Sequence, residues 1–212
     1  MRRHAMLLLA LACAAVLPVA PARGAVGCTL NDPDRDIQKL FPGATGYRTS
    51  FVTIAERGGK DLAARIEKRL GDRLDPVYEA LDVPYAYYTV LKGEAVIGYV
   101  HGVNQKGKYG GMQMILATNT EGLVTGFYYQ KISSPEAARF RDKAFTGQFV
   151  GLRLSDFDRF RSGSEEERAA SPVARIKDPS TKSAEDFRAT LRGVMKNLIL
   201  LEELLRASGG QK

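Results

Sequence analysis

Alternating hydrophobic and polar positions in the middle of the chain predict four consecutive β-strands. The first two runs cover residues 85–91 and 94–103. Short turns at 92–93, 106–111 and 119–122 separate the four runs. Strands joined by such turns pair with their neighbours in the sequence, so we expect an antiparallel meander as the frame of the fold.

Apolar residues spaced three and four positions apart predict helices on both sides of the meander. The strongest pattern covers residues 183–207, where an apolar stripe follows Ser183 and Asp186, a pair that resembles a capping box. A smaller amphipathic helix is expected at 59–70. The fold class is therefore α+β: an antiparallel β-meander sheet packed by helices, with a long C-terminal amphipathic helix.

The remaining segments carry weaker patterns. Either Asp32 or Asp34 is suited to cap a short helix, and Pro42-Gly43 would end it. In chain order we expect that helix at 37–41, a strand at 47–55, helical pieces over 134–160, an exposed polar loop or a short solvated turn at 162–170 and an extended segment at 176–182.

Residues 1–25 have the pattern of a secretory signal peptide. Arg2 and Arg3 precede an apolar run over 6–16, and the small residues at 20–22 offer a cleavage site. This run is shorter than the ~20 residues of a transmembrane helix, although an uncleaved anchor is the alternative. We expect an exported, periplasmic protein, divided into a signal peptide (1–25), a linker with a short helix (26–45), a folded domain (46–207) and a disordered tail (208–212).

Cysteine content and charge exclude several classes of protein. Cys28 would be the only cysteine of the exported chain, so an internal disulfide is excluded. Small residues precede Cys28 as in a lipobox, but Arg23 interrupts the apolar approach, so we favour a free thiol over a lipid anchor. Loss of the signal would lower the net charge from +7 to about +4, too little to indicate nucleic-acid binding.

Candidate chemistry is sparse. One histidine, His101, and one cysteine would remain after export, which is too few for a metal site, and His101 is expected to pack as an ordinary strand residue. The sequence has no phosphate-binding loop, no dinucleotide fingerprint and no serine-hydrolase motif. We therefore predict no catalytic residue and no metal.

Glycines mark two places where a ligand could approach the sheet. Gly98 and Gly102 share one face of the second strand and leave space for a ligand or a packed helix. The segment 106–111 combines glycines, two lysines and Tyr109, which suits a flat or anionic ligand.

The order of short motifs over residues 85–149 is similar to the FMN-binding domain of the periplasmic flavin subunits of the Rnf and sodium-pumping NADH:quinone oxidoreductase complexes. The motifs are Gly98-Tyr99-Val100, Gly107-Lys108-Tyr109-Gly110-Gly111, the segment 119–126, Ser133-Ser134-Pro135, and Phe145 with Gln148-Phe149 and Gly151. The resemblance implies an FMN cofactor and an electron carrier or subunit rather than a stand-alone enzyme. It also implies a redox partner protein or a membrane electron-transfer complex.

The attachment segment of that family departs from its pattern here. Asp178 and Thr181 match the motif, but Lys182 replaces its glycine and Asp186 replaces its terminal hydroxyl acceptor. We therefore expect FMN to be held without a covalent bond, with its phosphate at the N–H groups that open the last helix. The alternative is a degenerate relative that has lost flavin and acts as a binding or assembly module of a membrane complex.

The residues expected to contact FMN come from three segments. They are Tyr109, Gly110, Gly111 and Met112; Ser133 and Ser134; and Ser180, Thr181, Lys182 and Ser183. Further candidates for stacking on the ring are Met114, Tyr128 and Tyr129, for which a place in the hydrophobic core is the alternative.

Overall fold

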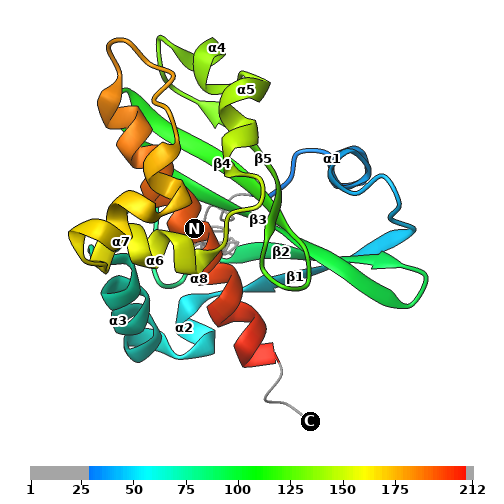
Figure 1. Cartoon of the computed structure of the whole chain (residues 1–212). Helices are drawn as coiled ribbons and strands as arrows, with labels where there is room; N and C mark the ends of the chain where they lie inside the picture. Colours follow the sequence, from blue (N-terminus) through cyan, green and yellow to red (C-terminus); the bar gives the residue numbers. More distant parts are fainter. Residues whose placement is uncertain (1–28, 209–212) are drawn as a thin grey trace, which may run out of the picture.

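The computed structural model describes residues 29–208 and shows an α+β fold built on one antiparallel sheet (Figure 1). The strands lie in sequence order across the sheet, so the predicted meander is confirmed, and the strand expected near 47–55 joins it as a fifth strand, β1, at the β2 edge. The strands are β1 Gly46–Val52, β2 Tyr85–Lys92, β3 Ala95–Gly107, β4 Gly110–Thr118 and β5 Val124–Ile132.

The turn between β3 and β4 is tighter than the sequence indicated. Gly107 pairs directly with Gly110, so only Lys108 and Tyr109 form the turn. The predicted six-residue loop at 106–111 is therefore wrong, because its outer residues extend the two strands. The first hairpin turn is also displaced by one position, to Gly93 and Glu94, with Gly93 at a φ of 60°.

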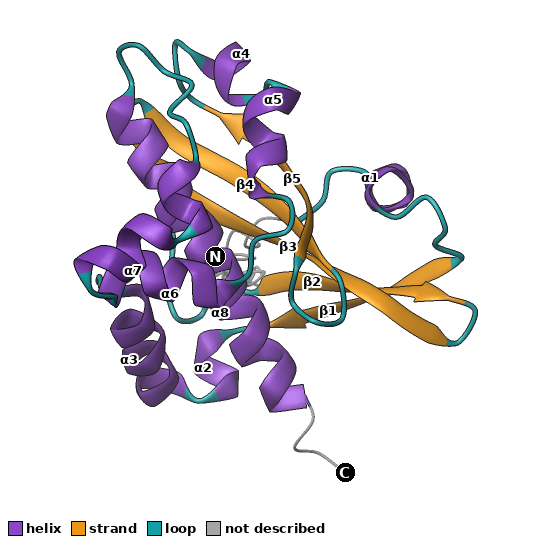
Figure 2. Cartoon of the chain, in the orientation of Figure 1, coloured by secondary structure: helices purple, strands orange, loops and turns teal. Residues whose placement is uncertain are grey.

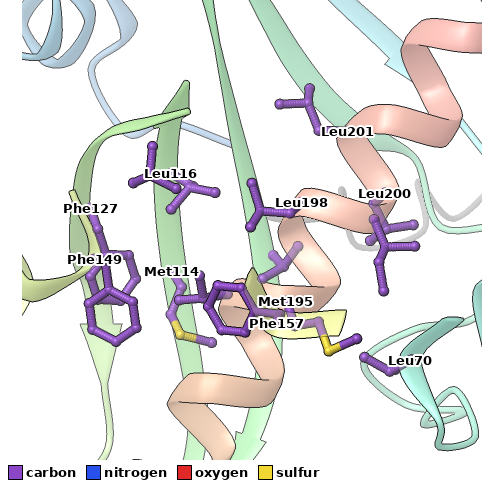
Figure 3. Packing of buried hydrophobic residues seen from close by; sticks show 14 of the residues in the cluster. Leu70, Met114, Leu116, Phe127, Phe149, Phe157, Met195, Leu198, Leu200 and Leu201 are labelled. Atoms are coloured by element: carbon purple, nitrogen blue, oxygen red, sulfur yellow. The ribbon is translucent and has the colours of Figure 1, made fainter. Parts of the chain in front are cut away.

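The long helix α8 (Ala184–Ser208) covers one face of the sheet, as predicted (Figure 2). Its apolar stripe enters the larger of two hydrophobic clusters, together with side chains from β3, β4 and β5. Figure 3 shows Met195 and Leu198 of α8 beside Met114 and Leu116 of β4. Burial of this stripe is the main hydrophobic contribution to the position of α8.

Helix α1 (Pro33–Leu40) covers the opposite face of the sheet (Figure 2). Asp32 caps it by accepting the N–H of Arg35 at 3.2 Å. Phe41, directly after the helix, fills the space above Gly98, where a Cβ atom would lie 2.6 Å from the Phe41 ring. Of the two occupants expected above Gly98, a ligand or a helix, the structure therefore has the helix.

The segment that precedes α1 is also part of the fold. The N–H of Leu30 donates to the Tyr88 hydroxyl at 3.1 Å, and the amide of Gln130 donates to the carbonyl of Thr29 at 2.8 Å. Residues 29–45 thus pack on the sheet instead of forming a linker, and the folded unit begins before residue 46.

The other helices lie around the α8 side of the sheet or at its ends. Two sequence-based expectations are corrected here: residues 54–57 are helical where a strand was expected to continue to Ala55, and the expected polar loop contains an exposed helix, capped by Ser164. These elements are α2 Ile54–Arg57, α3 Gly59–Leu70, α4 Ala137–Phe140, α5 Lys143–Thr146, η1 Gly147–Phe149, α6 Leu154–Ser162, α7 Glu165–Ala170 and η2 Pro172–Arg175.

Several expectations lie outside the described residues. They concern the export signal at 1–25, Cys28 and nearly all of the tail at 208–212. Within residues 29–208, no helix combines the length and the apolar character that a membrane crossing requires.

Candidate functional site

Three segments that are distant in the sequence meet at the first turn of α8. The β3–β4 turn reaches it through the N–H of Lys108, which donates to Oδ1 of Asp186 at 2.7 Å. Gly107 permits this approach, since a Cβ atom on it would lie 2.7 Å from the same oxygen. Gly110 faces the segment after β5, since a Cβ atom added to it would lie 3.2 Å from Cβ of Ser133. We call this meeting point the α8 corner.

The segment after β5 is joined to the start of α8 by Glu136. Its Oε1 accepts hydrogen bonds from the N–H and the hydroxyl of Thr181, at 2.9 and 2.8 Å, and its Oε2 accepts the N–H of Lys182 at 2.9 Å. The N–H of Thr181, with that of Lys182 and the hydroxyl, lowers the pKa of Glu136 to about 2. The donors predicted to hold a phosphate therefore already hold a carboxylate that is ionised at neutral pH.

The predicted capping box at Ser183 is not formed. Oδ1 of Asp186 accepts from Lys108, and within residues 29–208 its Oδ2 has no hydrogen-bond partner. Ser180 is also engaged elsewhere, because its N–H and hydroxyl both donate to Asp178, at 2.8 and 2.7 Å. Of the four predicted phosphate contacts, Thr181 and Lys182 are thus the ones whose N–H groups converge on an anion.

The predicted ring contacts differ in their accessibility. Tyr109 is 46% exposed, with the ammonium of Lys108 5.6 Å from its ring centroid. Gly111 lies under Tyr78, whose ring would be 3.2 Å from an added Cβ. Met112 is only 1% exposed and belongs to the core, so its side chain does not face a ligand in this structure.

The further stacking candidates are mostly core residues. Met114 and Tyr129 are buried under α8, and the Tyr129 hydroxyl hydrogen-bonds Thr190 at 2.6 Å. Tyr128 lies half-buried on the α1 face, with the ammonium of Lys39 5.8 Å from its ring. Tyr109 is therefore the aromatic ring of the predicted set that the α8 corner presents to solvent.

A shallow cavity of about 520 Å³ adjoins the α8 corner. It is lined by the α4–α5 region and by residues 177–179, which directly precede the Glu136 contacts. Arg139 and Lys177 line it together with Asp142 and Asp178, so its basic and acidic side chains balance, and the buried ring of Phe145 forms part of its apolar lining. The cavity is close to the α8 corner in the sequence through residues 177–179, but Thr181 and Lys182 do not line it.

A buried cluster of charges lies further along α8, and no sequence pattern indicated it. Lys196 and Glu79 form an ion pair in which both side chains are 1% exposed. Arg192 donates to Oε1 of Glu79 at 2.9 Å and to the exposed Asp72 at 2.7 Å. Burial lowers the pKa of Lys196 to about 8. Burial acts to raise the pKa of Glu79, but the charge of Lys196 and the bonds from Arg192 hold it below its ordinary value.

His101 lies beside this cluster and packs as expected of a strand residue. Its Nδ1 is 2.9 Å from Oδ1 of Asn197, and the Asn197 amide donates to the His101 carbonyl at 3.0 Å. These contacts and the ion pairs of Glu79 link the α3–β2 connection, β3 and α8. We interpret the cluster as structural, because its charges are directed at one another.

Comparison with known proteins adds no relative. Neither a protein-family model nor a curated protein matches this sequence. Within the described range 29–208, no group of three or more His, Cys, Asp or Glu side chains is arranged to hold a metal ion.

Proposed function

We propose that the protein is an exported FMN-binding electron carrier that holds its flavin non-covalently at the α8 corner. The observation that carries this proposal is the convergence there of the three segments predicted to contact FMN. The predicted contacts at 109–112, 133–134 and 180–183 lie far apart in the sequence, and the fold brings their segments together through Lys108, Glu136 and Asp186, which were not predicted to contact FMN.

The donors at the corner fit a phosphate in number and kind. The N–H groups of Thr181 and Lys182 and the Thr181 hydroxyl already surround an oxyanion. The exposed Lys182 ammonium would add positive charge, and Tyr109 offers a ring face. When bound, FMN supplies one- and two-electron transfer, while the chain binds and orients it and a redox partner or membrane complex exchanges the electrons.

Non-covalent binding is supported by what occupies the attachment segment. Asp186 stands at the position of the acceptor hydroxyl, and it is buried and bonded to Lys108. A carboxylate cannot form the phosphoester that a threonine forms. Flavin bound to this chain should accordingly pass into the supernatant when the protein is precipitated with acid.

A second candidate is a flavin-free binding or assembly module of a membrane complex. The observation that favours it is Glu136, which neutralises the anion site from within the chain. FMN phosphate and this carboxylate would compete for the same N–H groups.

An FMN titration of the purified protein, followed by absorption and fluorescence, separates the two candidates. Lys182→Glu should weaken FMN binding at least ~tenfold, since a charge-assisted phosphate contact contributes ~1.5–3 kcal/mol, while riboflavin binding should be nearly unchanged. The matched control is Lys68→Glu, the same charge reversal at an exposed position of α3. A protein that binds neither FMN nor riboflavin would favour the flavin-free module.

A further inference from the structure

A second cavity, of about 360 Å³, opens beside the C-terminal half of α8. It lies ~20 Å along the helix axis from the α8 corner, given the rise of 1.5 Å per residue. Leu198, Leu201 and Leu205 form its apolar wall, and Figure 3 shows the first two projecting from α8 toward the sheet. Tyr99 of β3 closes another side. The volume falls within the range of small-molecule sites and equals that of about twelve water molecules.

A buried hydroxyl without a partner lies in the lining of this cavity. Thr118 pairs directly with Tyr99 across β3 and β4, so both side chains lie on the same face of the sheet. Thr118 is 1% exposed, and its Oγ1 has no hydrogen-bond partner within the described part of the chain. Buried hydroxyls are nearly always hydrogen-bonded, so this one indicates a missing polar partner.

The mouth of the cavity is favourable for an anion. Leu154 and Ser155 are the first two residues of α6, and within residues 29–208 no side chain caps their N–H groups. The third residue, Asp156, caps the helix start from the other side, because its Oδ2 accepts the N–H of Arg153 at 3.0 Å. The exposed guanidinium of Arg153 lies next to them and forms no ion pair with any residue from 29 to 208. Arg153 and the N–H groups of Leu154 and Ser155 would attract a negatively charged group, while Asp156 already offsets part of the α6 dipole.

The acidic residues around the cavity are paired or solvated, and Asp156 at the start of α6 is paired with Arg159 at 3.0 Å. Glu202 is already paired, with its Oε2 2.9 Å from Nη2 of Arg69. Glu121 is exposed in the β4–β5 turn, where water solvates its carboxylate. The turn itself is rigid, because Oδ1 of Asn119 accepts the N–H groups of Glu121 and Leu123 at 3.0 and 2.9 Å. The cavity is thus preformed, apolar inside and cationic at one rim.

We propose that this cavity is a binding site for a small amphipathic carboxylic acid, distinct from the α8 corner. The aliphatic or aromatic body lies against the α8 leucines and Tyr99. The carboxylate lies at Arg153 and the first N–H groups of α6. In the natural ligand, a polar atom on the aliphatic or aromatic part hydrogen-bonds the hydroxyl of Thr118. Simple fatty acids lack this atom and still bind through their chain and carboxylate.

The test uses octanoate and its uncharged counterpart octan-1-ol, titrated into the isotopically labelled protein. Octanoate should bind saturably and shift amide resonances in residues 118–122, 153–155 and 198–205. Arg153→Glu should weaken octanoate at least ~tenfold and change octanol binding less than ~twofold. Arg48→Glu, the same reversal at an exposed arginine of β1, should leave both affinities unchanged.

Two results would overturn the proposal. One is the absence of saturable binding of both probes to the folded protein. The other is octanoate binding that shifts resonances elsewhere and is equally strong in the Arg153→Glu and Arg48→Glu variants. Leu205→Asp provides a further check, because an acid on the half-buried apolar wall should weaken both probes without disturbing the core.

Discussion

Glu136 and Thr181 are joined by two hydrogen bonds to one carboxylate oxygen: Oε1 of Glu136 accepts both the N–H of Thr181, at 2.9 Å, and its hydroxyl, at 2.8 Å. The Thr181 and Lys182 donors lower the pKa of Glu136 to about 2, so the carboxylate stays charged in all but strong acid. A phosphate that reaches these donors at neutral pH must therefore replace an existing anion. Under the proposed function, this competition would set the affinity of the α8 corner for FMN.

Glu136→Ala should tighten the binding of FMN. The change removes the competing carboxylate and leaves the N–H groups of Thr181 and Lys182 free to bind phosphate. FMN affinity is expected to rise ~tenfold, while riboflavin, which lacks the phosphate, gains little. Fluorescence titration measures both ligands. Glu165→Ala, on the exposed helix α7, is the control and should behave as the parent protein. Unchanged FMN affinity in folded Glu136→Ala would place the phosphate elsewhere.

Local patterns were sufficient to predict most of the fold but little of this competition. The strands follow from a period of two, and α8 follows from an apolar stripe with helical spacing. Glu136 contacts a segment 45 positions away, so its partners depend on tertiary packing. Helix α7 was missed because it has no apolar stripe, although Ser164 and Glu167 carry the capping-box spacing. Motif order selected three segments that lie at the α8 corner, but not the contacts of Glu136 and Asp186 that join them, and the burial of Met112 depends on the packed sheet.

Glu79→Gln should strongly destabilise the protein. It leaves the buried charge of Lys196 without its counterion, and breaking a buried pair in this way costs ~3–5 kcal/mol. Asp72→Asn is the matched control, because Asp72 also binds Arg192 but is 58% exposed, and its loss should cost less than ~1 kcal/mol. Urea denaturation measures the free energy of unfolding of both variants. Equal, small effects would show that water reaches Lys196 in the native state.

A hydrophobicity pattern alone could not predict the buried charge cluster of Lys196, Glu79 and Arg192. Lys196 is buried on α8 between Met195 and Asn197, although a binary pattern assigns a lysine to solvent. Its counterion comes from the irregular connection between α3 and β2, which carries no periodic signal.

Stability should fall as the pH decreases from 6.5 toward 4. Burial lowers the pKa of His101 to about 4, with the charge of Lys196 acting in the same direction and the Asn197 hydrogen bond opposing it. In this window the unfolded chain takes up a proton and the folded chain does not. The free energy of unfolding therefore declines by on the order of 3 kcal/mol across the window. The share of the stability that depends on neutral His101 is present in full above pH 6.5, and nearly all of that share is lost when the pH reaches the folded pKa of about 4.

Urea denaturation at several pH values checks this dependence. The upper part of the window, above ~pH 5, separates His101 from the carboxylates, whose ordinary pKa values lie lower. His101→Leu should be less stable overall, since Asn197 loses a partner, but its stability should vary little between ~pH 5 and ~6.5. An equal slope in parent and variant would assign the dependence to other groups.

The effect of Gly193→Ala on the free energy of unfolding should change sign when Met114 is also replaced by alanine. Gly193 lies inside α8, where glycine is less favourable than alanine by ~1 kcal/mol. A Cβ atom at this position would lie 1.8 Å from Cε of the fully buried Met114 and 3.3 Å from Cβ of Gln105. Gly193→Ala should therefore destabilise the parent protein by ~1–3 kcal/mol through overpacking. In a Met114→Ala background the clash is absent, and the same change should stabilise by ~1 kcal/mol.

Urea denaturation of the four proteins gives the coupling energy. Stabilisation by Gly193→Ala already in the parent would mean that Met114 moves aside freely and that the close approach of α8 to β4 does not require glycine.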